Sequence, residues 1–313
     1  MSNVIYRDDE NYPKLLKEIG KQAPKQLYYK VYGSSHSDIF NNCLGVVGSR
    51  KLTHYGKQAI EKIVGEVATP RLAGQAGITI VSGFMYGGDA EAHKAALRVG
   101  GRTIAVMPCG IDRISPEDQE DLYNEIIENN GMIVSEYEGN MAPALWTYPQ
   151  RNKIVAGLSK AVLVIEAGEK SGSLITANLA KKFNRKVFAL PGPITSSASK
   201  GTNMLIKEGA EMVTSAQDIL KWFRNRSSHS NCELLEKTGS LRKQRALHAQ
   251  KFQNIRFQNI EFQILSFLER EPLGIDELSR DLELSVSELS VKLSMMEMQG
   301  LIEMKGDKYY NKK

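Results

Sequence analysis

Short apolar runs that alternate with helical segments constrain the fold of this chain more than any other feature. Each run ends at a small or turn-forming residue, and most are followed by apolar residues at helical spacing; the runs cover residues 44–47, 78–81, 103–107, 132–135, 161–165 and 187–190. Strands that are apolar along their whole length are buried on both faces, which is typical of a parallel sheet covered by helices. The pattern therefore predicts an α/β fold with a doubly wound, mostly parallel sheet, whose ligands bind beyond the carboxyl ends of the strands.

A different pattern begins near residue 261. Three helical segments are followed by a hairpin that turns at Gly306 and Asp307, an order that is typical of a winged helix. The polar stretch before them has no strong apolar period. The expected organisation is a short lead-in (1–39), a main α/β domain (40–220), a basic linker (221–259) and a small C-terminal winged-helix domain (260–313).

The positive charge of the chain is concentrated in the expected linker. The whole chain carries +5; residues 221–260 hold nine Lys or Arg against two Glu, whereas residues 261–313 hold seven basic and eleven acidic residues. Nonspecific affinity for DNA depends on cationic side chains. The C-terminal segment is therefore a poor candidate for holding a polyanion.

Composition and motifs argue against several classes of protein. Hydrophobic residues make up 42% and charged residues 25% of the 313 residues, as in ordinary globular proteins, and no apolar run reaches the roughly 18 residues of a membrane span. Cys43, Cys109 and Cys232 lie far apart, so we expect a cytoplasmic protein with no zinc site, disulfide framework or cofactor. The sequence lacks GxGxxG, GxxxxGK[ST], GxSxG and HExxH motifs, so we do not expect an enzyme.

Gly48-Ser49-Arg50 lies at the turn between an apolar run and the following helix. A glycine lets the backbone approach a ligand closely, and the unpaired N–H groups at the start of a helix attract anions. The planar guanidinium of Arg50 suits phosphate. A tight turn with a solvated arginine fits these residues equally well, so both interpretations stay open.

A second turn of this kind begins at Ser82 and Gly83. Asp89 is a candidate cap for the helix that follows, because a carboxylate accepts from the first N–H groups of a helix. His93 lies one turn further on, among alanines, and is expected to be a packed or capping residue and not a catalyst.

The third turn covers residues 171–177. Ser171 or Ser173 can cap the helix through its hydroxyl, or the same N–H groups can receive a phosphate oxygen. Glu166 precedes this turn. Its carboxylate either orients a base or sugar, or satisfies nearby backbone donors.

Residues 146–153 (WTYPQRNK) interleave two aromatic side chains with two cations. Aromatic rings stack on bases while Arg and Lys contact phosphates, a combination found in proteins that hold single strands. An aromatic core segment with a helix beginning near Asn152 is equally compatible with the segment.

Seven blocks, in order over about 170 residues, resemble the DNA-processing protein A family (DprA, also called Smf). They are VVGSRKLTHYG at 46–56, VSGFMYGGDAEAHKAAL at 81–97, TIAVMPCGID at 103–112, YPQRNKIVAGLS at 148–159, LVIEAGEKSGSLITANLA at 163–180, FALPG at 188–192 and GTNMLIKEGA at 201–210. Residues 275–302 also resemble the family's optional winged helix. No segment resembles the N-terminal helical domain that is common in longer members.

The resemblance implies a Rossmann-like domain and a homodimer that binds single-stranded DNA without strong sequence preference. It further implies that the protein protects incoming DNA and loads a RecA-type recombinase in natural transformation and recombination. The residues expected at the DNA site are Gly48, Ser49, Arg50, Ser82, Gly83, Tyr148, Arg151, Asn152, Lys153, Ser171, Gly172, Ser173 and Thr176.

The second and third blocks depart from the family pattern. Tyr86 stands where a pattern like SGLARGID has an arginine, and Gly88 replaces an isoleucine; Ser115-Pro116 stands where Tyr-Pro is usual. Loss of the loop arginine removes one expected phosphate contact, so the affinity for DNA or the path of the DNA is expected to differ from that in the rest of the family.

Two other classes of function compete with the DNA-binding hypothesis. Nucleotide-cleaving phosphoribohydrolases of related fold use an Arg and a Glu near a PGGxGT loop, but the corresponding loop here reads SGSLIT, and Glu166 alone keeps that alternative open. A winged-helix transcription regulator is the other alternative, and the acidic C-terminal segment argues against it.

Overall fold

The computed structural model describes residues 3–32, 37–70, 77–235, 264–265, 267–268, 272–282 and 285–311. The chain divides into two compact units, residues 1–225 and 226–313. The strands of the first unit are β1 (Asn3–Tyr6), β2 (Gln26–Val31), β3 (Cys43–Val47), β4 (Thr79–Gly83), β5 (Thr103–Gly110), β6 (Met132–Tyr137), β7 (Ala161–Val164), β8 (Lys186–Ala189) and β9 (Glu211–Met212).

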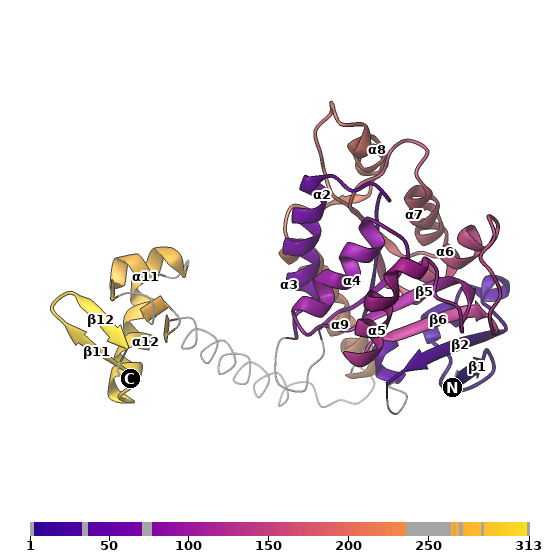
Figure 1. The fold of residues 1–313 in the computed structure, drawn as a ribbon. Helices are drawn as coiled ribbons and strands as arrows, with labels where there is room; N and C mark the ends of the chain where they lie inside the picture. The colour runs from indigo at the N-terminus through magenta and orange to yellow at the C-terminus, as the bar shows by residue number, and fades with distance from the viewer. Residues whose placement is uncertain are drawn as a thin grey trace. The chain divides into compact units, whose positions relative to one another are not determined.

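Helices connect most of these strands (Figure 1). The α-helices are α1 (Lys14–Lys17), α2 (His54–Ala59), α3 (Gly65–Ala68), α4 (Gly88–Arg98), α5 (Glu120–Glu128), α6 (Thr147–Leu158), α7 (Gly172–Lys182), α8 (Lys200–Lys207) and α9 (Ala216–Leu235). A π-helical turn, η3 (Ile60–Val64), joins α2 to α3, and short 3-10 turns are η1 (Gly20–Gln22), η2 (Ser37–Phe40), η4 (Glu117–Gln119) and η5 (Ser197–Ser199).

The strands form one sheet in the order β1-β2-β6-β5-β4-β3-β7-β8-β9. Every neighbouring pair in the part β6-β5-β4-β3-β7-β8-β9 is parallel. At the other end, β2 pairs antiparallel with β6, and β1 pairs antiparallel with β2. The chain builds outward from β3 on one side and then returns to build from β3 on the other. The predicted doubly wound, mostly parallel α/β fold is therefore confirmed, and its strand order reverses at β3, where ligands bind in such sheets.

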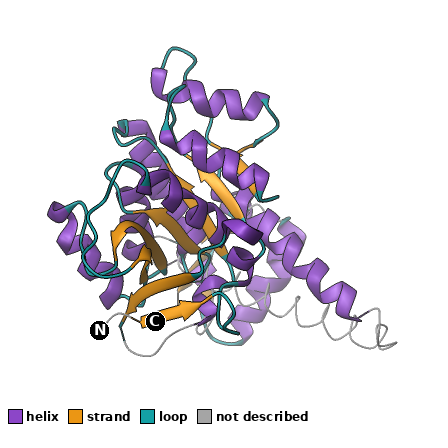
Figure 2. Ribbon diagram, turned by 90° about the vertical axis from the view of Figure 1, so that its right-hand side faces the viewer, coloured by secondary structure: helices purple, strands orange, loops and turns teal. Residues whose placement is uncertain are grey.

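Helices cover both faces of the sheet (Figure 2), which explains why the strands are apolar throughout. Successive side chains of a strand point to opposite faces. Val47 of β3 belongs to the core cluster that contains residues of α1, α6 and α7. Leu44 and Val46 belong to the cluster that contains residues of η3, α4 and α9.

The segment expected as a short lead-in contributes two strands to the sheet. Residues 26–32 predicted one of them, which is β2. β1 has four residues (NVIY), of which three are exposed, and a run this short was not predicted as a strand. α1 packs against α6 in the same core, through Leu16 among others.

The second unit contains β10 (Leu273–Gly274), α11 (Ile275–Asp281), α12 (Val286–Met298), β11 (Ile302–Lys305) and β12 (Lys308–Asn311). Its three strands pair in the order β10-β12-β11, and the hairpin turns at Gly306, whose φ is 69°. Of the first helix expected here, residues 264–265 and 267–268 are described and helical. α9 extends into the expected linker, whose residues 236–259 lie outside the described part of the chain.

None of the helices in the described residues has both the length and the apolar composition that a membrane span requires.

Candidate functional site

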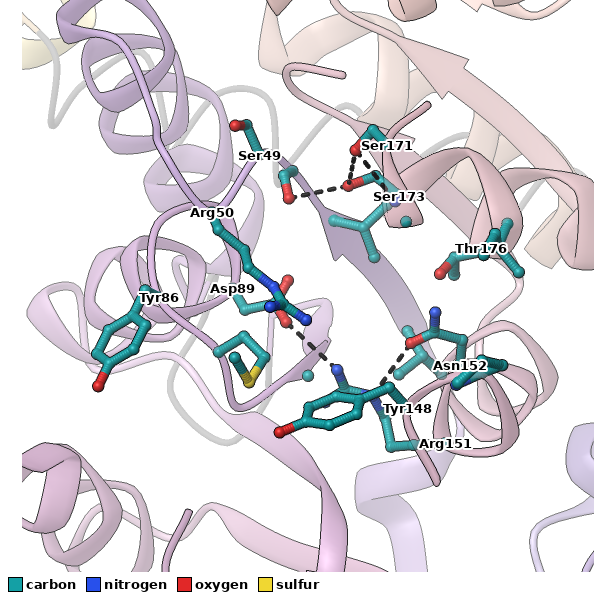
Figure 3. A pocket seen from close by; sticks show the side chains of 18 of the residues that line it. Ser49, Arg50, Tyr86, Asp89, Tyr148, Arg151, Asn152, Ser171, Ser173 and Thr176 are labelled. Atoms are coloured by element: carbon teal, nitrogen blue, oxygen red, sulfur yellow. Dashed lines mark hydrogen bonds and ion pairs between the residues drawn. The ribbon is translucent and has the colours of Figure 1, made fainter. Parts of the chain in front are cut away.

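A cavity of about 530 Å³ opens at the carboxyl ends of β4, β3 and β7, the three central strands where the order reverses (Figure 3). Loops that follow these strands and the first turns of α6 and α7 line it. All expected site residues except Ser82 and Lys153 are among its lining residues, which are Val47, Gly48, Ser49, Arg50, Gly83, Met85, Tyr86, Asp89, Tyr148, Pro149, Arg151, Asn152, Val155, Gly168, Lys170, Ser171, Gly172, Ser173, Ile175 and Thr176.

Internal hydrogen bonds hold the turn after β3. The Ser173 hydroxyl donates to the carbonyl oxygen of Gly48 (2.8 Å), and the backbone N–H of Gly88 donates to that of Ser49 (3.0 Å). A Cβ atom added at Gly88 would lie 2.6 Å from the Cα of Gly48, so the two glycines let the first and second turns touch. The exposed side chain of Arg50 is free of this framework and reaches over Tyr148, with its Cζ atom 5.5 Å from the ring centroid.

The second turn places Ser82 and Asp89, but not Gly83, differently from the expectation. Gly87 is the N-cap residue of α4 and makes no side-chain cap hydrogen bond, so Asp89 lies inside the helix and does not cap it. Ser82 is fully buried and its hydroxyl donates to the Val46 carbonyl (2.6 Å), so it supports the turn from beneath and does not line the cavity. Gly83 lines the cavity, and a Cβ atom there would lie 2.1 Å from Nη1 of Arg151. A glycine is needed at this position because a guanidinium packs directly on it.

Arg151 is the most buried cation of the cavity, with 5% of its surface exposed. Its Nη1 donates to the Val106 carbonyl (2.7 Å), its Nε donates to Asn152 Oδ1 (3.1 Å), and its Nη2 lies 3.7 Å from Asp89 Oδ2. Burial raises the pKa of Asp89 and lowers that of Arg151, and each charge counteracts the shift of the other. The expected contact of Arg151 with phosphate would compete with these interactions.

The aromatic and cationic segment forms the first turns of α6. The helix begins at Thr147, with Pro149 in its first turn, where a proline removes no needed hydrogen bond. Tyr148 and Asn152 face the cavity, whereas Lys153 is half-buried on another side and pairs with Glu136 at 3.1 Å. Lys153 therefore lies outside the cavity that the other cations share.

Ser171 caps α7: its hydroxyl oxygen accepts from the backbone N–H of Ser173 (3.3 Å). Of the two serines considered for this role, Ser173 instead bonds the turn after β3. The first turn of α7 contains no acidic residue, and the exposed Lys170 precedes it. This end of the cavity therefore favours an anion, through the positive end of the helix and the lysine.

Glu166 satisfies backbone and side-chain donors at the start of α2. The carboxylate is 2% exposed, and it accepts from the backbone N–H (2.9 Å) and the hydroxyl (2.5 Å) of Thr53. A Cβ atom at Gly56 would lie 2.7 Å from Glu166 Cδ, so that glycine leaves room for the carboxylate. Of the two roles considered for Glu166, the structure shows the support of neighbouring backbone, and Glu166 is not among the residues that line the cavity.

His93 is packed inside the fold, as expected. Its Nε2 lies 2.8 Å from the Gly83 carbonyl, which can only accept, so this nitrogen carries the proton; its Nδ1 lies 2.6 Å from the Thr103 hydroxyl. Burial lowers the pKa of His93 to about 4. The imidazole therefore stays neutral at pH 7 and ties α4 to β4 and β5.

The cavity combines exposed cations with flat aromatic surfaces. Arg50 and Lys170 supply the cations, and Tyr148 and Tyr86 supply the rings. Lys170 was not among the expected site residues, although its position just before the capping Ser171 was a usable signal. In the described part of the chain, no three His, Cys, Asp or Glu residues are grouped as a metal site would require. The arrangement suits a ligand with both phosphates and unpaired bases.

Comparison with known families matches residues 3–224 to DNA recombination-mediator protein A and residues 258–308 to the DprA winged helix domain. The first match covers more than half of the chain. The second confirms the predicted C-terminal winged helix. The resemblance inferred from seven sequence blocks is also confirmed.

Several curated proteins are similar to this chain. Protein Smf of Escherichia coli strain K12 is 41% identical over 219 residues, which are 70% of this chain and 56% of that protein. Protein Smf of Synechocystis is 41% identical over 213 residues, 68% of this chain and 52% of that protein. DNA processing protein DprA of Streptococcus pneumoniae is 40% identical over 216 residues, 69% and 72% of the two chains. The matched part of the chain thus spans about half the length of the two Smf proteins.

Two solved structures share the fold at substantial sequence identity. DNA processing protein A from Streptococcus pneumoniae superposes with a TM-score of 0.64 and 38% identity, over 70% of this chain and 73% of that one. The protein of the same name from Helicobacter pylori superposes with a TM-score of 0.61 and 30% identity, over 72% and 97%. The latter structure was analysed for its single-stranded DNA binding mode.

Proposed function

Because the chain belongs to the DNA recombination-mediator protein A family, we propose that it binds single-stranded DNA in the cavity beyond β3 and delivers it to a RecA-type recombinase. The observation that carries this proposal is the exposed guanidinium of Arg50 lying 5.5 Å from the ring of Tyr148 at the cavity. A phosphate at Arg50 and an unpaired base on the aromatic surface are the two parts of a nucleotide in a single strand.

The same proposal covers the partners and the setting of the protein. The single-stranded DNA binding described for the Helicobacter pylori protein supports the choice of ligand. We propose a cytoplasmic homodimer that protects incoming DNA during natural transformation and recombination. Membership of a recombination-mediator family supports a mediating role and not a catalytic one.

The proposed DNA contacts differ in kind among the expected site residues. Arg50 is exposed and is proposed to hold phosphate, together with Lys170 and the first N–H groups of α7. The small residues of the first and third turns are proposed to shape the protein backbone that the single-stranded DNA touches; they are Gly48, Ser49, Ser171, Gly172, Ser173 and Thr176. Arg151 is proposed to position Asp89 and Gly83, because each of its three nitrogen atoms already has one partner.

A nucleotide-cleaving enzyme is less compatible with this cavity. The carboxylate that kept this alternative open, Glu166, is buried against Thr53 at the start of α2. A general base must lie within hydrogen-bond reach of the group it deprotonates. A nucleotide hydrolysis assay distinguishes the two functions, and release of a free base from nucleotides would favour the enzyme.

We expect tight binding of single-stranded DNA and weak binding of duplex. A gel shift over a salt series, with single- and double-stranded oligonucleotides of one sequence, measures both. The logarithm of affinity should fall with the logarithm of salt with a slope of about −0.7 per phosphate neutralised. Arg50 and Lys170 together then require a slope of about −1.4 or steeper. Equal affinity for the two forms at physiological salt would contradict the proposal.

The winged helix offers little positive charge on its longer helix. Lys292 of α12 has only 3% of its surface exposed, whereas Val291, Met295 and Met298 on the same helix are exposed. A winged helix that grips DNA normally presents a cationic recognition helix. Exposed methionines suit adaptable contacts with protein. We therefore propose that this unit contacts a protein, within the homodimer or in a partner.

Removal of residues 260–313 should leave most of the affinity for single-stranded DNA. The first unit has its own core and contains the whole cavity, and the truncated chain keeps the basic segment. Fluorescence anisotropy with a labelled oligonucleotide measures the change, with circular dichroism and light scattering as checks on fold and oligomeric state. A loss of tenfold or more, about 1.4 kcal/mol, in a folded dimer would assign DNA binding to the winged helix.

A further inference from the structure

The ring of Tyr86 is exposed at the cavity and anchored at one end. Tyr86 is 45% exposed, and its hydroxyl donates to Asp118 Oδ1 at 2.7 Å. This hydrogen bond also raises the pKa of Tyr86, so the phenol is neutral at physiological pH. The side chain therefore offers an apolar face and no charge to a ligand.

The backbone that carries this ring is bound to the Arg50 turn. Gly87 has a φ of 71°, which favours glycine, and a Cβ atom there would lie 2.3 Å from the carbonyl oxygen of Ser49. The N–H of Gly88 donates to the same oxygen at 3.0 Å. A ring held in this way loses little conformational freedom when it binds, which favours affinity.

Arg50 lies between two aromatic rings. Figure 3 shows Tyr86 on one side of Arg50 and Tyr148 on the other. Tyr148 also forms a cation–π contact with Arg50. A phosphate held by Arg50 would therefore have an aromatic face available to the nucleotide on each side of it.

We propose that Tyr86 is a base-stacking residue, whose ring packs on an unpaired base next to the phosphate that Arg50 holds, while Tyr148 receives the base on the other side. This inference rests on the proposed binding of single-stranded DNA. It gives Tyr86 a contact that is independent of charge, at the position where the family pattern has an arginine. A paired base does not offer its face to such a ring, so the residue also favours single strands over duplex.

The test compares Tyr86→Ala, Tyr86→Phe and Tyr86→Arg with the unaltered full chain. Each protein is titrated with a thymidine oligonucleotide and with an abasic oligonucleotide of equal length, over a salt series. Tyr55→Ala is the matched control: Tyr55 is 43% exposed, its hydroxyl donates to the Pro191 carbonyl at 2.7 Å, and it does not line the cavity. If Tyr86→Ala fails to fold, Tyr86→Leu keeps the bulk without an aromatic face.

Tyr86→Ala should weaken binding of the thymidine strand at least about fivefold with an unchanged salt slope, since stacking is worth about 1–3 kcal/mol per base. It should leave binding of the abasic strand unchanged. Tyr86→Phe should keep most of the affinity, because the ring remains when the bond to Asp118 is lost. Tyr86→Arg should make the slope steeper by about 0.7. Tyr55→Ala should bind as the unaltered chain does.

Three results would overturn the inference while the proposed function stands. They are equal binding of thymidine DNA by Tyr86→Ala, an equal loss on the abasic strand, and a loss in Tyr86→Phe as large as that in Tyr86→Ala. The last would assign the effect to the bond with Asp118. Failure of the unaltered chain to bind any single strand would instead overturn the proposed function itself.

Discussion

Arg151→Met is expected to lower the free energy of unfolding by about 3–5 kcal/mol, the usual cost of removing one partner of a buried ion pair. Asp89 is 8% exposed and would be left without its 3.7 Å neighbour, and the Val106 carbonyl would lose its 2.7 Å donor. Chemical denaturation at pH 7 measures the change. Arg98→Met is the matched control, because Arg98 pairs with Glu61 on the surface and such pairs contribute at most about 1 kcal/mol.

The pH dependence of the stability of Arg151→Met shows whether the unpaired charge of Asp89 causes the loss of stability. Burial already raises the pKa of Asp89, and loss of Arg151 should raise it further. A carboxyl with a raised pKa in the folded state makes the folded state bind more protons than the unfolded state above pH about 4, so stability falls as pH rises. The deficit of Arg151→Met relative to the unaltered chain should therefore narrow from pH 7 toward pH 4. A deficit that is constant over this range would show that the charge of Asp89 is not responsible.

Arg50→Ala is expected to weaken binding of single-stranded DNA by about tenfold to a hundredfold. A charge-assisted hydrogen bond is worth about 1.5–3 kcal/mol, and Arg50 is the exposed cation over Tyr148. Arg50→Lys should restore only part of the affinity, because a point charge cannot replace the planar fork of donors. Fluorescence anisotropy at fixed salt measures all three proteins.

Two controls separate binding from folding for Arg50. The thermal midpoint of Arg50→Ala should match that of the unaltered chain, because the side chain is exposed and the hydrogen bonds of the turn involve other groups. Arg98→Ala removes an exposed arginine outside the cavity and should leave affinity nearly unchanged. If Arg50→Ala melts early and binds normally once folded, Arg50 is a structural residue.

Most strands of the sheet could be predicted from the sequence, and the exceptions have a common cause. The six apolar runs correspond to strands β3 to β8, because a strand buried on both faces must be apolar throughout. β9 has two residues and β1 has four, and both lie at edges of the sheet. Edge strands this short are specified by their neighbours and carry no period of their own.

The start of α6 was also not predicted from the sequence. The sequence indicated at most a helix from about Asn152, whereas the helix begins at Thr147. The segment's aromatic and proline residues have weak helical propensity, and contacts with the sheet outweigh it. Only this earlier start places Tyr148 and Arg151 on the first turns that face the cavity.

Apolar runs that alternate with helical segments, and glycine-rich turns at the ends of those runs, are local features. The sequence by itself therefore determined the fold class and the edge of the sheet where a ligand is expected. It could not separate Arg50 from Arg151 and Lys153, because residue type and spacing make all three candidates for phosphate. The tertiary structure left Arg50 exposed, paired Lys153 with Glu136 and buried Arg151 beside Asp89. The reason is that a cation's partner comes from distant strands and helices, and the free energy of burying a charge depends on that partner.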